Sequence, residues 1–417
     1  MAPTLADANR VFARIGLLSF GGPAAQIALM HRELVEQRDW LTEEEYLRAL
    51  SFCMLLPGPE AMQLATYAGW KLHGTKGGLI AGLLFVGPGA LVILALSILY
   101  VTLGPTPIAQ ALLLGVKAAV VGIVIHALQR VAKKALKGRI DYLIAALAFV
   151  GLFFFGLPFP LVIAAAAVWG WLRGRGKPAI GLPTIAPPMG DTLRTVALWG
   201  AIWLLPLAAL HLAEGGILTQ IGVYFSKLAV FTFGGAYAVL GWMTQTVVTD
   251  FGWLTAGQMM DALGLAETTP GPLILVTQFV GFLAAYQQGG MALGIAAALV
   301  TLWVTFAPCF LWIFAGAPWL EHLTRRPALQ GALAAITAAV VGVIANLSVW
   351  FAAHVFFATV PLVQVGPLSV IAPLWSTIQP VAVVLALAAG YLIVLRHWSL
   401  PLVLALSALA SWAISLV

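Results

Sequence analysis

Three short motifs occur twice in this chain, and the separation between the two occurrences is constant at 213 residues. The motifs are Phe20-Gly21-Gly22, Trp40-Leu41-Thr42 and Pro57-Gly58-Pro59, which return as Phe233-Gly234-Gly235, Trp253-Leu254-Thr255 and Pro270-Gly271-Pro272. A further match, Ala118–Gly122 with Ala338–Gly342, follows at a separation of 220 residues. We infer an internal duplication. Because the repeated glycine and proline breaks lie inside apolar stretches, the pattern is typical of secondary transporters with broken helices.

The amino-acid composition indicates that most of the chain is surrounded by lipid rather than water. The 417 residues are 62% hydrophobic and only 9% charged, whereas about a quarter of the residues in a soluble domain are charged. Apolar runs of roughly the 20 residues that span a bilayer follow one another along the chain. These features predict an all-α polytopic membrane protein. The formal charge of +6 does not indicate nucleic-acid binding, and Cys53 and Cys309 are expected to be buried thiols rather than a disulfide.

Orientation follows the rule that short cytoplasmic loops are rich in lysine and arginine. Loops 129–139 and 173–194 carry the richest clusters, so both are expected in the cytoplasm. The N-terminus is then cytoplasmic, the C-terminus is periplasmic, and the loop 31–48 lies outside. The expected thirteen spans lie near 11–30, 50–70, 77–101, 108–128, 141–156, 158–172, 195–212, 219–240, 262–284, 291–317, 328–350, 376–395 and 399–417.

This scheme places sixteen lysines and arginines inside, three outside, and two within spans, namely Lys117 and Lys227. The arms 141–156 and 158–172 are short for full crossings, so a tilted or re-entrant hairpin is the alternative there. No cleavable signal peptide is expected, because Met1–Ala8 lacks a basic start followed by an apolar core.

The charge bias changes sign between equivalent loops. The basic loop 129–139 corresponds to 350–375, which has no lysine or arginine. We therefore predict two inverted-topology repeats, an N-terminal one over 1–172 and a C-terminal one over 213–417. The intervening segment 173–212 is expected to hold a linker and an unpaired helix that turns the second copy over.

Breaks in a membrane helix free backbone N–H groups, which are tolerated where they line a cavity or contact a ligand. The helix starts after Pro59 and Pro272 also present positive dipole ends, so we predict anion binding there. Gln63 and Gln278 are candidate neutral ligands. Simple kinking or close packing through small residues is the alternative. The predicted anion-binding residues are Gly21, Gly22, Pro57, Gly58, Pro59, Gln63, Lys117, Gly234, Gly235, Pro270, Gly271 and Pro272.

Few charged residues lie within the spans. Arg14 and Lys227 are repeat equivalents that either gather anions at the two mouths or extend to lipid headgroups. Lys117 lies mid-span, where a lone charge is costly and functional by default. Glu60 and Glu267 flank the breaks, and each is a candidate to carry a proton or to pair with Lys117 or Arg14. No metal-ligand spacing, nucleotide-binding motif or nucleophile motif is present, so we expect no metal, no cofactor and no enzyme activity.

Thr42 and Glu45 form a predicted capping box, which begins a short interfacial helix. Trp40 and Trp253 are candidate anchors at the membrane interface. In the second copy the acids are replaced over Thr255–Gln258. This feature is therefore expected to be structural rather than shared chemistry.

The spaced motifs resemble the chromate ion transporter family in its long, two-domain form. The resemblance covers essentially the whole chain, and it implies export of chromate from the bacterial cytoplasm across the inner (plasma) membrane, with chromate resistance as the result. It also implies a drive from an ion or proton gradient and thirteen spans in antiparallel halves. The residues that carry it are Ser19-Phe20-Gly21-Gly22-Pro23, Arg38-Asp39-Trp40-Leu41, Leu56-Pro57-Gly58-Pro59 and Gln63, then Phe231-Thr232-Phe233-Gly234-Gly235 and Thr269-Pro270-Gly271-Pro272.

The residues by themselves indicate an anion carrier, and chromate comes only from the resemblance. Chromate and sulfate are tetrahedral dianions of similar size, so sulfate or another oxyanion is the alternative substrate. Protons or the membrane potential are the expected driving force, and a homodimer in the lipid bilayer is left open. A membrane-embedded enzyme acting on lipid would need a polar cluster at one interface, which the sequence lacks apart from the acidic loop 33–45. A channel is the third alternative, which an inverted repeat disfavours.

Overall fold

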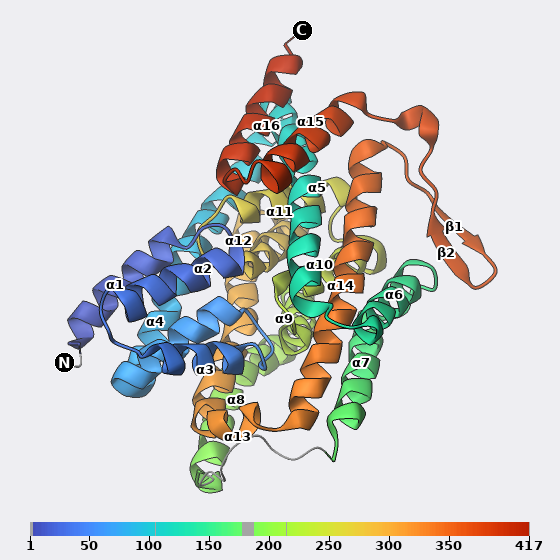
Figure 1. Cartoon of the computed structure of the whole chain (residues 1–417). Coiled ribbons are helices and arrows are strands. Elements are labelled where there is room, and N and C mark those ends of the chain that lie inside the picture. Colours follow the sequence, from blue (N-terminus) through green and yellow to red (C-terminus); the bar gives the residue numbers. More distant parts are fainter. Residues whose placement is uncertain (1–2, 105, 177–186, 214, 417) are drawn as a thin grey trace. The chain divides into compact units, whose positions relative to one another are not determined.

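The protein is described from a computed structural model, over residues 3–104, 106–176, 187–213 and 215–416. Nearly all of its regular structure is helical (Figure 1), which confirms the predicted helical class. Among the described residues, five segments are long and apolar enough to cross a membrane by length and composition, and shorter apolar helices accompany them. The chain is a multi-pass membrane protein, and the count of thirteen spans stays a prediction. The five segments are Glu60–Leu103, Pro107–Ala135, Met189–Leu212, Leu273–Thr324 and Pro327–Phe356.

Two compact units divide the chain, and each combines segments from both sequence halves. Unit 1 comprises Met1–Ile98, Pro178–Ala236 and Thr269–Pro327. Its elements are α1 (Leu5–Leu18), α2 (Gly22–His31), the π-helical turn η1 (Arg32–Glu36), α3 (Glu43–Cys53), most of α4 (Glu60–Leu103), α8 (Met189–Leu212), α9 (Gly216–Phe231), the 3₁₀ turns η3 (Leu273–Leu275) and η4 (Ala317–Trp319), α12 (Val276–Gly316) and α13 (Leu320–Thr324).

Unit 2 comprises Leu99–Lys177, Tyr237–Thr268 and Ala328–Val417. The predicted boundaries at 172 and 213 describe sequence repeats and do not coincide with either unit. Its elements are α5 (Pro107–Ala135), α6 (Arg139–Phe153), α7 (Phe159–Gly174), α10 (Ala236–Gln245), the π-helical turns η2 (Thr246–Asp250) and η6 (Tyr391–Leu395), α11 (Ala256–Glu267), α14 (Pro327–Phe356), β1 (Leu362–Val365), β2 (Leu368–Ile371), the 3₁₀ turn η5 (Trp375–Thr377), α15 (Pro380–Gly390) and α16 (Leu400–Ile414).

The strands β1 and β2 form an antiparallel hairpin, in which Leu362 lies opposite Ile371. An all-α prediction misses this hairpin. Its sequence signal is a run of β-branched and apolar residues interrupted by Gly366, whose φ of +61° suits a tight turn.

Two of the long helices are helical hairpins. α4 turns back at Gly74, with φ of +64°, and α12 turns back at Gly290, with φ of +73°. Small residues let the two arms of α4 approach closely, since a Cβ on Gly69 would lie only 2.4 Å from the carbonyl oxygen of Gly77. The turns implied between the predicted spans 50–70 and 77–101, and between 262–284 and 291–317, are therefore confirmed.

The spans expected near 11–30, 50–70, 219–240 and 262–284 are not continuous helices. Each consists of two helices that flank a glycine or proline break. In the first, α1 has 14 residues and α2 has 10, which at 1.5 Å per residue is about 21 Å and about 15 Å. Neither helix alone covers a hydrocarbon core of about 30 Å. The predicted breaks are confirmed, and the four continuous spans are corrected to pairs of short helices.

Capping boxes begin the helices that lead to the two Pro-Gly-Pro motifs. Thr42 accepts from the N–H of Glu45 at 3.2 Å, and the Glu45 carboxylate accepts from the N–H of Thr42 at 3.1 Å. Thr255 and Gln258 make the same pair of hydrogen bonds at 3.2 and 2.9 Å. The predicted start of α3 is confirmed, and a glutamine serves the same purpose at α11.

One face of unit 1 gathers the ends of several helices. Glu45, in the first turn of α3, lies 3.2 Å from the Nζ of Lys71, and Arg48 lies 3.8 Å from Glu321 of α13. Residues this close cannot lie on opposite sides of a hydrocarbon core about 30 Å thick. The expectation that the loop 31–48 lies on the opposite side from these partners is therefore wrong.

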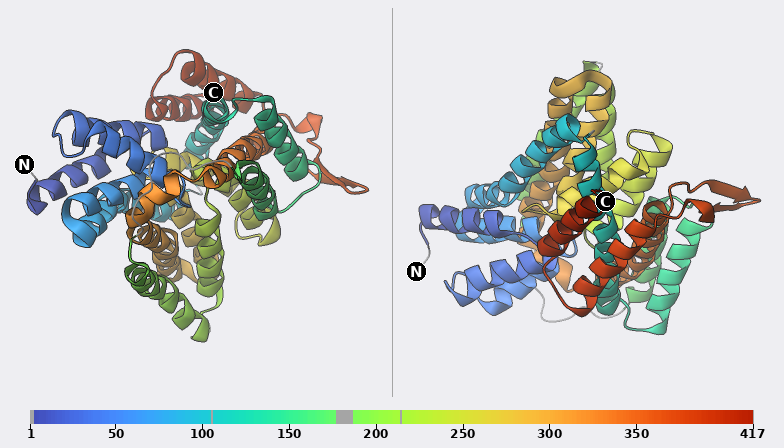
Figure 2. Two further views of the ribbon diagram at one scale, coloured as in Figure 1. Left: turned by 60° about the horizontal axis from the view of Figure 1, so that its bottom comes forward. Right: turned by 90° about the horizontal axis from the view of Figure 1, so that it is seen from above.

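In unit 2, the last two helices pack along α5 (Figure 2). A Cβ on Gly115 would lie 2.1 Å from the carbonyl oxygen of Ser407, and one on Gly122 would lie 3.0 Å from the Cα of Gly390. Close approach through small residues is the usual way in which membrane helices associate. This packing positions α5, which carries Lys117.

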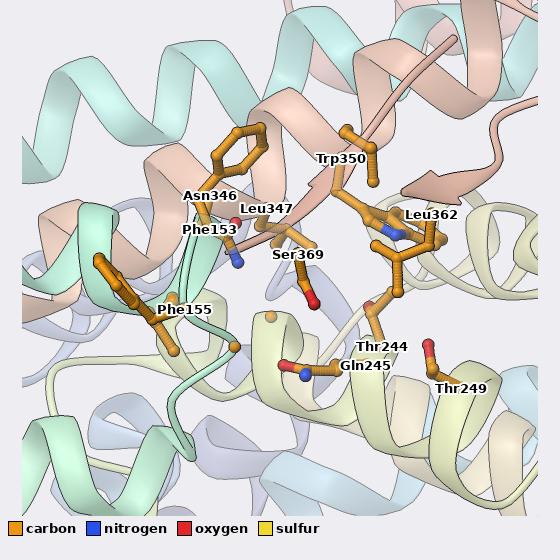
Figure 3. Close-up of a pocket in the computed structure, with 14 residues that line it drawn as sticks. Phe153, Phe155, Thr244, Gln245, Thr249, Asn346, Leu347, Trp350, Leu362 and Ser369 are labelled. Atoms are coloured by element: carbon orange, nitrogen blue, oxygen red, sulfur yellow. The ribbon is translucent and has the colours of Figure 1, made fainter. Parts of the chain in front are cut away.

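Unit 2 also contains a cavity of about 320 Å³ lined by neutral polar and aromatic residues. Figure 3 shows Phe155 from the α6–α7 turn, Thr244 and Gln245 from α10, and Ser369 from β2 facing the same space. The N–H of Ser369 donates to the carbonyl of Phe154 at 2.8 Å. The α6–α7 turn, the end of α10 and the hairpin therefore lie on one side of this unit.

Candidate functional site

The breaks of the two sequence halves are joined by crossed hydrogen bonds within unit 1. The N–H of Gly58, in the first Pro-Gly-Pro motif, donates to the carbonyl of Thr232 in the second half at 2.7 Å. The N–H of Gly271, in the second motif, donates to the carbonyl of Ser19 in the first half at 2.9 Å. Each Pro-Gly-Pro motif is thus bound to the residue that precedes the Phe-Gly-Gly motif of the other half. Unit 1 brings together most of the predicted anion-binding residues, namely Gly21, Gly22, Pro57, Gly58, Pro59, Gln63, Gly234, Gly235, Pro270, Gly271 and Pro272.

Side-chain hydroxyls end the two helices that lead into this junction. Ser19 donates to the carbonyl of Ile15, and Thr232 donates to the carbonyl of Leu228, each at 2.6 Å. Both capping residues are buried and have left the helical conformation. Their own carbonyls can then accept from the opposite Pro-Gly-Pro motif. Hydroxyl residues at equivalent positions, Ser19 and Thr232, are a sequence signal for this contact.

Six of the predicted glycines have φ values that other residues rarely adopt: Gly21 +84°, Gly22 +78°, Gly58 +123°, Gly234 +75°, Gly235 +97° and Gly271 +88°. Gly58 has little room for a side chain, because a Cβ there would lie 2.8 Å from Nε2 of Gln63 and 2.9 Å from Sγ of Cys309. At Gly271 the nearest atom would be Cδ1 of Leu275 at 3.1 Å.

Three buried glutamines bind backbone carbonyls in this unit. Gln26 donates to the carbonyl of Gly271 at 2.6 Å, Gln63 donates to that of Pro57 at 2.7 Å, and Gln278 donates to a carbonyl of α4 at 3.1 Å. Within the part of the chain that is described, their side-chain oxygens are buried and have no hydrogen-bond donor. A buried acceptor of this kind is available to a ligand or a water molecule. Gln63 and Gln278 are among the sequence predictions, whereas Gln26, which follows the first break by one turn of α2, is not.

The expectation of free N–H groups at the two motifs needs a correction. The N–H groups of Gly58 and Gly271 already donate to protein carbonyls, so neither atom is open to an anion in this conformation. The first turns after the breaks, at buried Ala61 and Ile274, keep the N–H groups that every helix start leaves without an intrahelical acceptor. An anion reaches the two glycines only when the crossed hydrogen bonds open.

Lys117 lies on α5 and belongs to unit 2, whereas the residues of the crossed junction belong to unit 1. Its Nζ is 3.2 Å from Oδ1 of Asp261 on α11, and the hydroxyl of Tyr100 donates to Oδ2 of Asp261 at 2.9 Å. Lys117 is thus paired with an acid other than the two that the sequence analysis considers, and its pairing with Glu60 or Glu267 stays a prediction. Asp261 is buried and is absent from the sequence predictions, although an acid inside the apolar run of α11 is a usable signal.

Glu267 ends α11 and is buried, and the hydroxyl of Tyr237 donates to its Oε1 at 2.5 Å. Both residues lie in unit 2, whereas the Pro-Gly-Pro motif that follows Glu267 belongs to unit 1. Glu60 begins α4 in unit 1 and is partly exposed. A proton-carrying role for either acid stays a prediction.

Arg14 pairs with Glu33 of η1, whose Oε1 lies 3.8 Å from the Arg14 Nε. Arg38 approaches Oε2 of the same buried carboxylate at 2.6 Å. The pairing of Arg14 with Glu60 or Glu267 likewise stays a prediction. Lys227 is exposed on α9. This exposure is compatible both with gathering anions and with extending to lipid headgroups.

A sequence profile described as "Chromate transporter" matches this chain twice, over residues 7–171 and 219–412. The chain belongs to the chromate transporter family. The double match agrees with the duplication found from the spaced motifs and with the long, two-domain form. No solved structure matches this chain.

Curated relatives of similar length support the assignment. The chromate transport protein of Cupriavidus metallidurans is 32% identical over 350 residues, which cover 82% of this chain and 81% of the relative. The chromate transport protein of Pseudomonas aeruginosa is 33% identical over 364 residues, which cover 85% and 82%. The probable chromate transport protein of Synechococcus elongatus is 31% identical over 346 residues, which cover 83% and 84%. This chain is similar to transport proteins along most of its length.

Proposed function

We propose that this chain is a secondary active transporter that exports chromate from the bacterial cytoplasm through the inner membrane and so confers chromate resistance. The observation that carries the proposal is the crossed junction of the two Pro-Gly-Pro breaks in a member of the chromate transporter family. Broken helices from two related halves, meeting inside a membrane protein, are the usual architecture of a transport site. The substrate follows from the family and from the names of the relatives.

The corrected place of the loop 31–48 supports the inverted arrangement. In our proposal, α1 with α2, and α3 with the first arm of α4, each enter the membrane from the cytoplasmic side and return to it. Two re-entrant pairs return the chain to the cytoplasm, as two full crossings would. Every later loop of this half therefore stays on the side of the membrane that the sequence predicts. The three arginines of the loop then join the sixteen cytoplasmic cations, and none of the 21 lysines and arginines remains on the outer side.

The second copy supports the opposite orientation. Its equivalent of the loop 31–48 includes η2, and Thr249 of η2 lines the same cavity as Phe155 and Ser369. The α6–α7 turn and the hairpin are the loops that we place outside, and 350–375 carries no lysine or arginine. Equivalent loops of the two copies thus belong to opposite faces in this proposal, with nine full crossings and four re-entrant pairs.

The membrane potential is a sufficient drive for export. A cytoplasm at negative potential repels anions, and each elementary charge that crosses gains about 2.3 kcal/mol per 100 mV. Chromate carries two negative charges, so a carrier that alternately exposes one site to the two sides would export it without ATP. A proton gradient is the alternative source of energy. Sulfate has the same shape and charge, so we expect it to compete.

The test is uptake of radiolabelled chromate into everted membrane vesicles, with and without excess sulfate. Energised accumulation that collapses with the membrane potential would support export, and inhibition by sulfate would measure selectivity. Accumulation should persist in the Lys133→Ala variant, which changes an exposed lysine at the cytoplasmic end of α5. If wild-type vesicles accumulate no chromate under any gradient, the export proposal fails.

A further inference from the structure

We propose that Lys117, Asp261 and Tyr100 form a proton-gated oxyanion site, in which Asp261 holds the lysine while the site is empty and releases it to the anion on taking up a proton. This inference rests on the proposed function, because it describes how that carrier binds its dianion. Asp261 and Tyr100 have no role in the transport proposal above. The site lies entirely within unit 2.

One partner of the ion pair is buried and the other is accessible. Asp261 is buried, with its two oxygens facing Lys117 at 3.2 Å and the hydroxyl of Tyr100 at 2.9 Å. Its side chain is only 4% exposed, whereas that of Lys117 is 24% exposed. The lysine therefore lies between the buried acid and accessible space, so a ligand can reach the ammonium group without reaching the carboxylate.

The accessible space beside Lys117 is a cavity of about 310 Å³. Its lining includes Lys117 from α5, Ala256 and Gly257 from the first turn of α11, His354 from α14, and Gln379. A Cβ on Gly257 would lie 3.6 Å from Nζ of Lys117, so the ammonium group lies beside the start of α11. The residues at the cavity wall offer one cation and several neutral hydrogen-bonding groups.

The electrostatics of this cavity favour an anion. The first turn of a helix carries a partial positive charge and N–H groups without intrahelical acceptors. Thr255 caps only the N–H of Gln258, so Ala256 and Gly257 keep theirs. A helix start and an ammonium group beside one another repel unless a negative charge separates them. Asp261 supplies that charge on the buried side of Lys117, and a tetrahedral oxyanion in the cavity would supply it on the accessible side.

Binding of the anion and of a proton should then be coupled. If Lys117 turns to a bound dianion, Asp261 is left as a buried carboxylate without its cation, which is strongly unfavourable. Protonation removes that penalty. Within the described part of the chain, the titratable groups facing this site are Lys117 on α5, Tyr100 on α4 and His354 on α14. The helix α16 also packs on α11, and its residues 400–414 include no titratable side chain.

The duplicated sequence does not repeat this ion pair. Thr337 of the second copy is equivalent to Lys117, and Arg48 of the first copy is equivalent to Asp261. The hydroxyl of Thr337 donates to the carbonyl of Leu333 in its own helix at 2.7 Å. A structural ion pair required by the duplicated fold would be expected in both copies.

The experiment measures binding of radiolabelled sulfate to the purified full-length chain in lipid nanodiscs between about pH 5 and about pH 8. Sulfate remains a dianion over this range, so any pH dependence arises in the protein. Wild-type protein should bind sulfate more tightly as the pH falls and should take up protons on binding. Lys117→Ala should abolish binding, and Lys133→Ala on the same helix should match the wild type.

Two variants separate gating from a structural role. Asp261→Asn removes the competing charge, so sulfate affinity should rise about tenfold at the upper end of the range and lose its pH dependence. Tyr100→Phe removes a hydrogen bond that favours the charged carboxylate, so the rise in affinity should move to higher pH. If Asp261→Asn does not fold, Tyr100→Phe decides by the position of that rise.

Equal affinity at every pH in the wild type, or an unmoved profile in Tyr100→Phe, would overturn the gated site. These outcomes are distinct from failure of the transport proposal. Vesicles that accumulate chromate while purified protein shows no pH-dependent binding would retain the transporter and refute the gate. Binding that follows pH as described, in a protein whose vesicles accumulate no chromate, would retain the gate and refute export.

Discussion

Segments 22–53 and 236–267 occupy equivalent places in the two halves, and they fold in the same way. Each has a ten-residue helix, a five-residue π-helical turn and a helix that starts from a capping box. Their charged residues differ. Glu33 in the first π-helical turn is replaced by Thr246, and Arg48 in the first copy is replaced by Asp261.

The difference shows which features the duplicated fold requires. In the first copy, Glu33 pairs with Arg14 and Arg38, which belong to the same half of the sequence. In the second copy, Asp261 pairs with Lys117 on a helix of the other half. Breaks and caps recur because the backbone depends on them. The two copies differ in their charges, and we expect their separate roles to depend on those charges.

The largest effects should follow from changes at the shared backbone. Gly58→Ala should lower stability by about 3 kcal/mol, because φ is +123° and the new Cβ meets two side chains. Gly271→Ala should lower it by about 1 kcal/mol, since its neighbour is a flexible leucine methyl group. Thermal unfolding of both variants in detergent measures the difference. Wild-type stability in both would contradict the requirement for glycine at the breaks.

The second comparison concerns Lys117 and its equivalent Thr337. Lys117→Ala should reduce chromate uptake by about a hundredfold, because the change leaves Asp261 buried without its cation and removes the proposed ligand. Thr337→Ala should stay close to wild type, since the threonine hydroxyl binds only within its own helix. Vesicle uptake with matched expression measures both. Similar loss in the two variants would show that position, and not charge, matters.

Replacing either of two buried acids by glutamine should change the free energy of unfolding by a smaller amount. Glu33→Gln weakens an ionic contact with Arg38 at 2.6 Å and should cost about 2 kcal/mol. Glu267→Gln should cost less than about 1 kcal/mol, because an amide oxygen can accept from Tyr237 as the carboxyl does. The readout is again thermal unfolding. The reverse order would mean that Glu267 is held by a charge.

The smallest effect concerns His31, whose equivalent is Thr244. The hydrogen bond to Glu43, at 2.6 Å, raises the pKa of His31 above 6.5, and Glu36 adds to this effect. The stabilisation is therefore fully present below about pH 6.5 and is lost as the pH rises through the folded-state pKa. His31→Gln should cost up to about 1 kcal/mol near pH 5.5 and little near pH 8.5.

Unfolding curves at the two pH values measure this difference, and Thr244→Ser is the matched control. The control should show no difference between the two pH values, because threonine and serine do not titrate there. A cost for His31→Gln that is constant with pH would mean that the imidazole contributes by packing alone.

Much of the fold could be predicted from the sequence. The constant spacing of the motifs identifies the duplication, and Thr42 with Glu45 identifies the start of α3. The glycines at the breaks all require the backbone that only glycine adopts easily. These features are local or repeated, so a single sequence displays them.

The contacts between distant segments could not be predicted in this way. Nothing local connects Asp261 with Lys117, or Gly271 with Ser19, because such pairs depend on how separate helices pack. The same limit explains the error in the loop 31–48. A run of about twenty apolar residues indicates one crossing, and the sequence does not show where the two short helices on either side of Gly21 and of Gly58 lead.

The opposite orientation of the two copies is the feature on which the transport proposal depends, and cysteine labelling tests it directly. Gln37 and Asp250 are exposed repeat equivalents, and the native Cys53 and Cys309 are buried. Single Gln37→Cys and Asp250→Cys variants would be treated with a membrane-impermeant maleimide in intact cells and in everted vesicles. We predict that position 250 reacts in cells and position 37 reacts only in everted vesicles. Reaction of both positions from the same side would contradict the inverted arrangement.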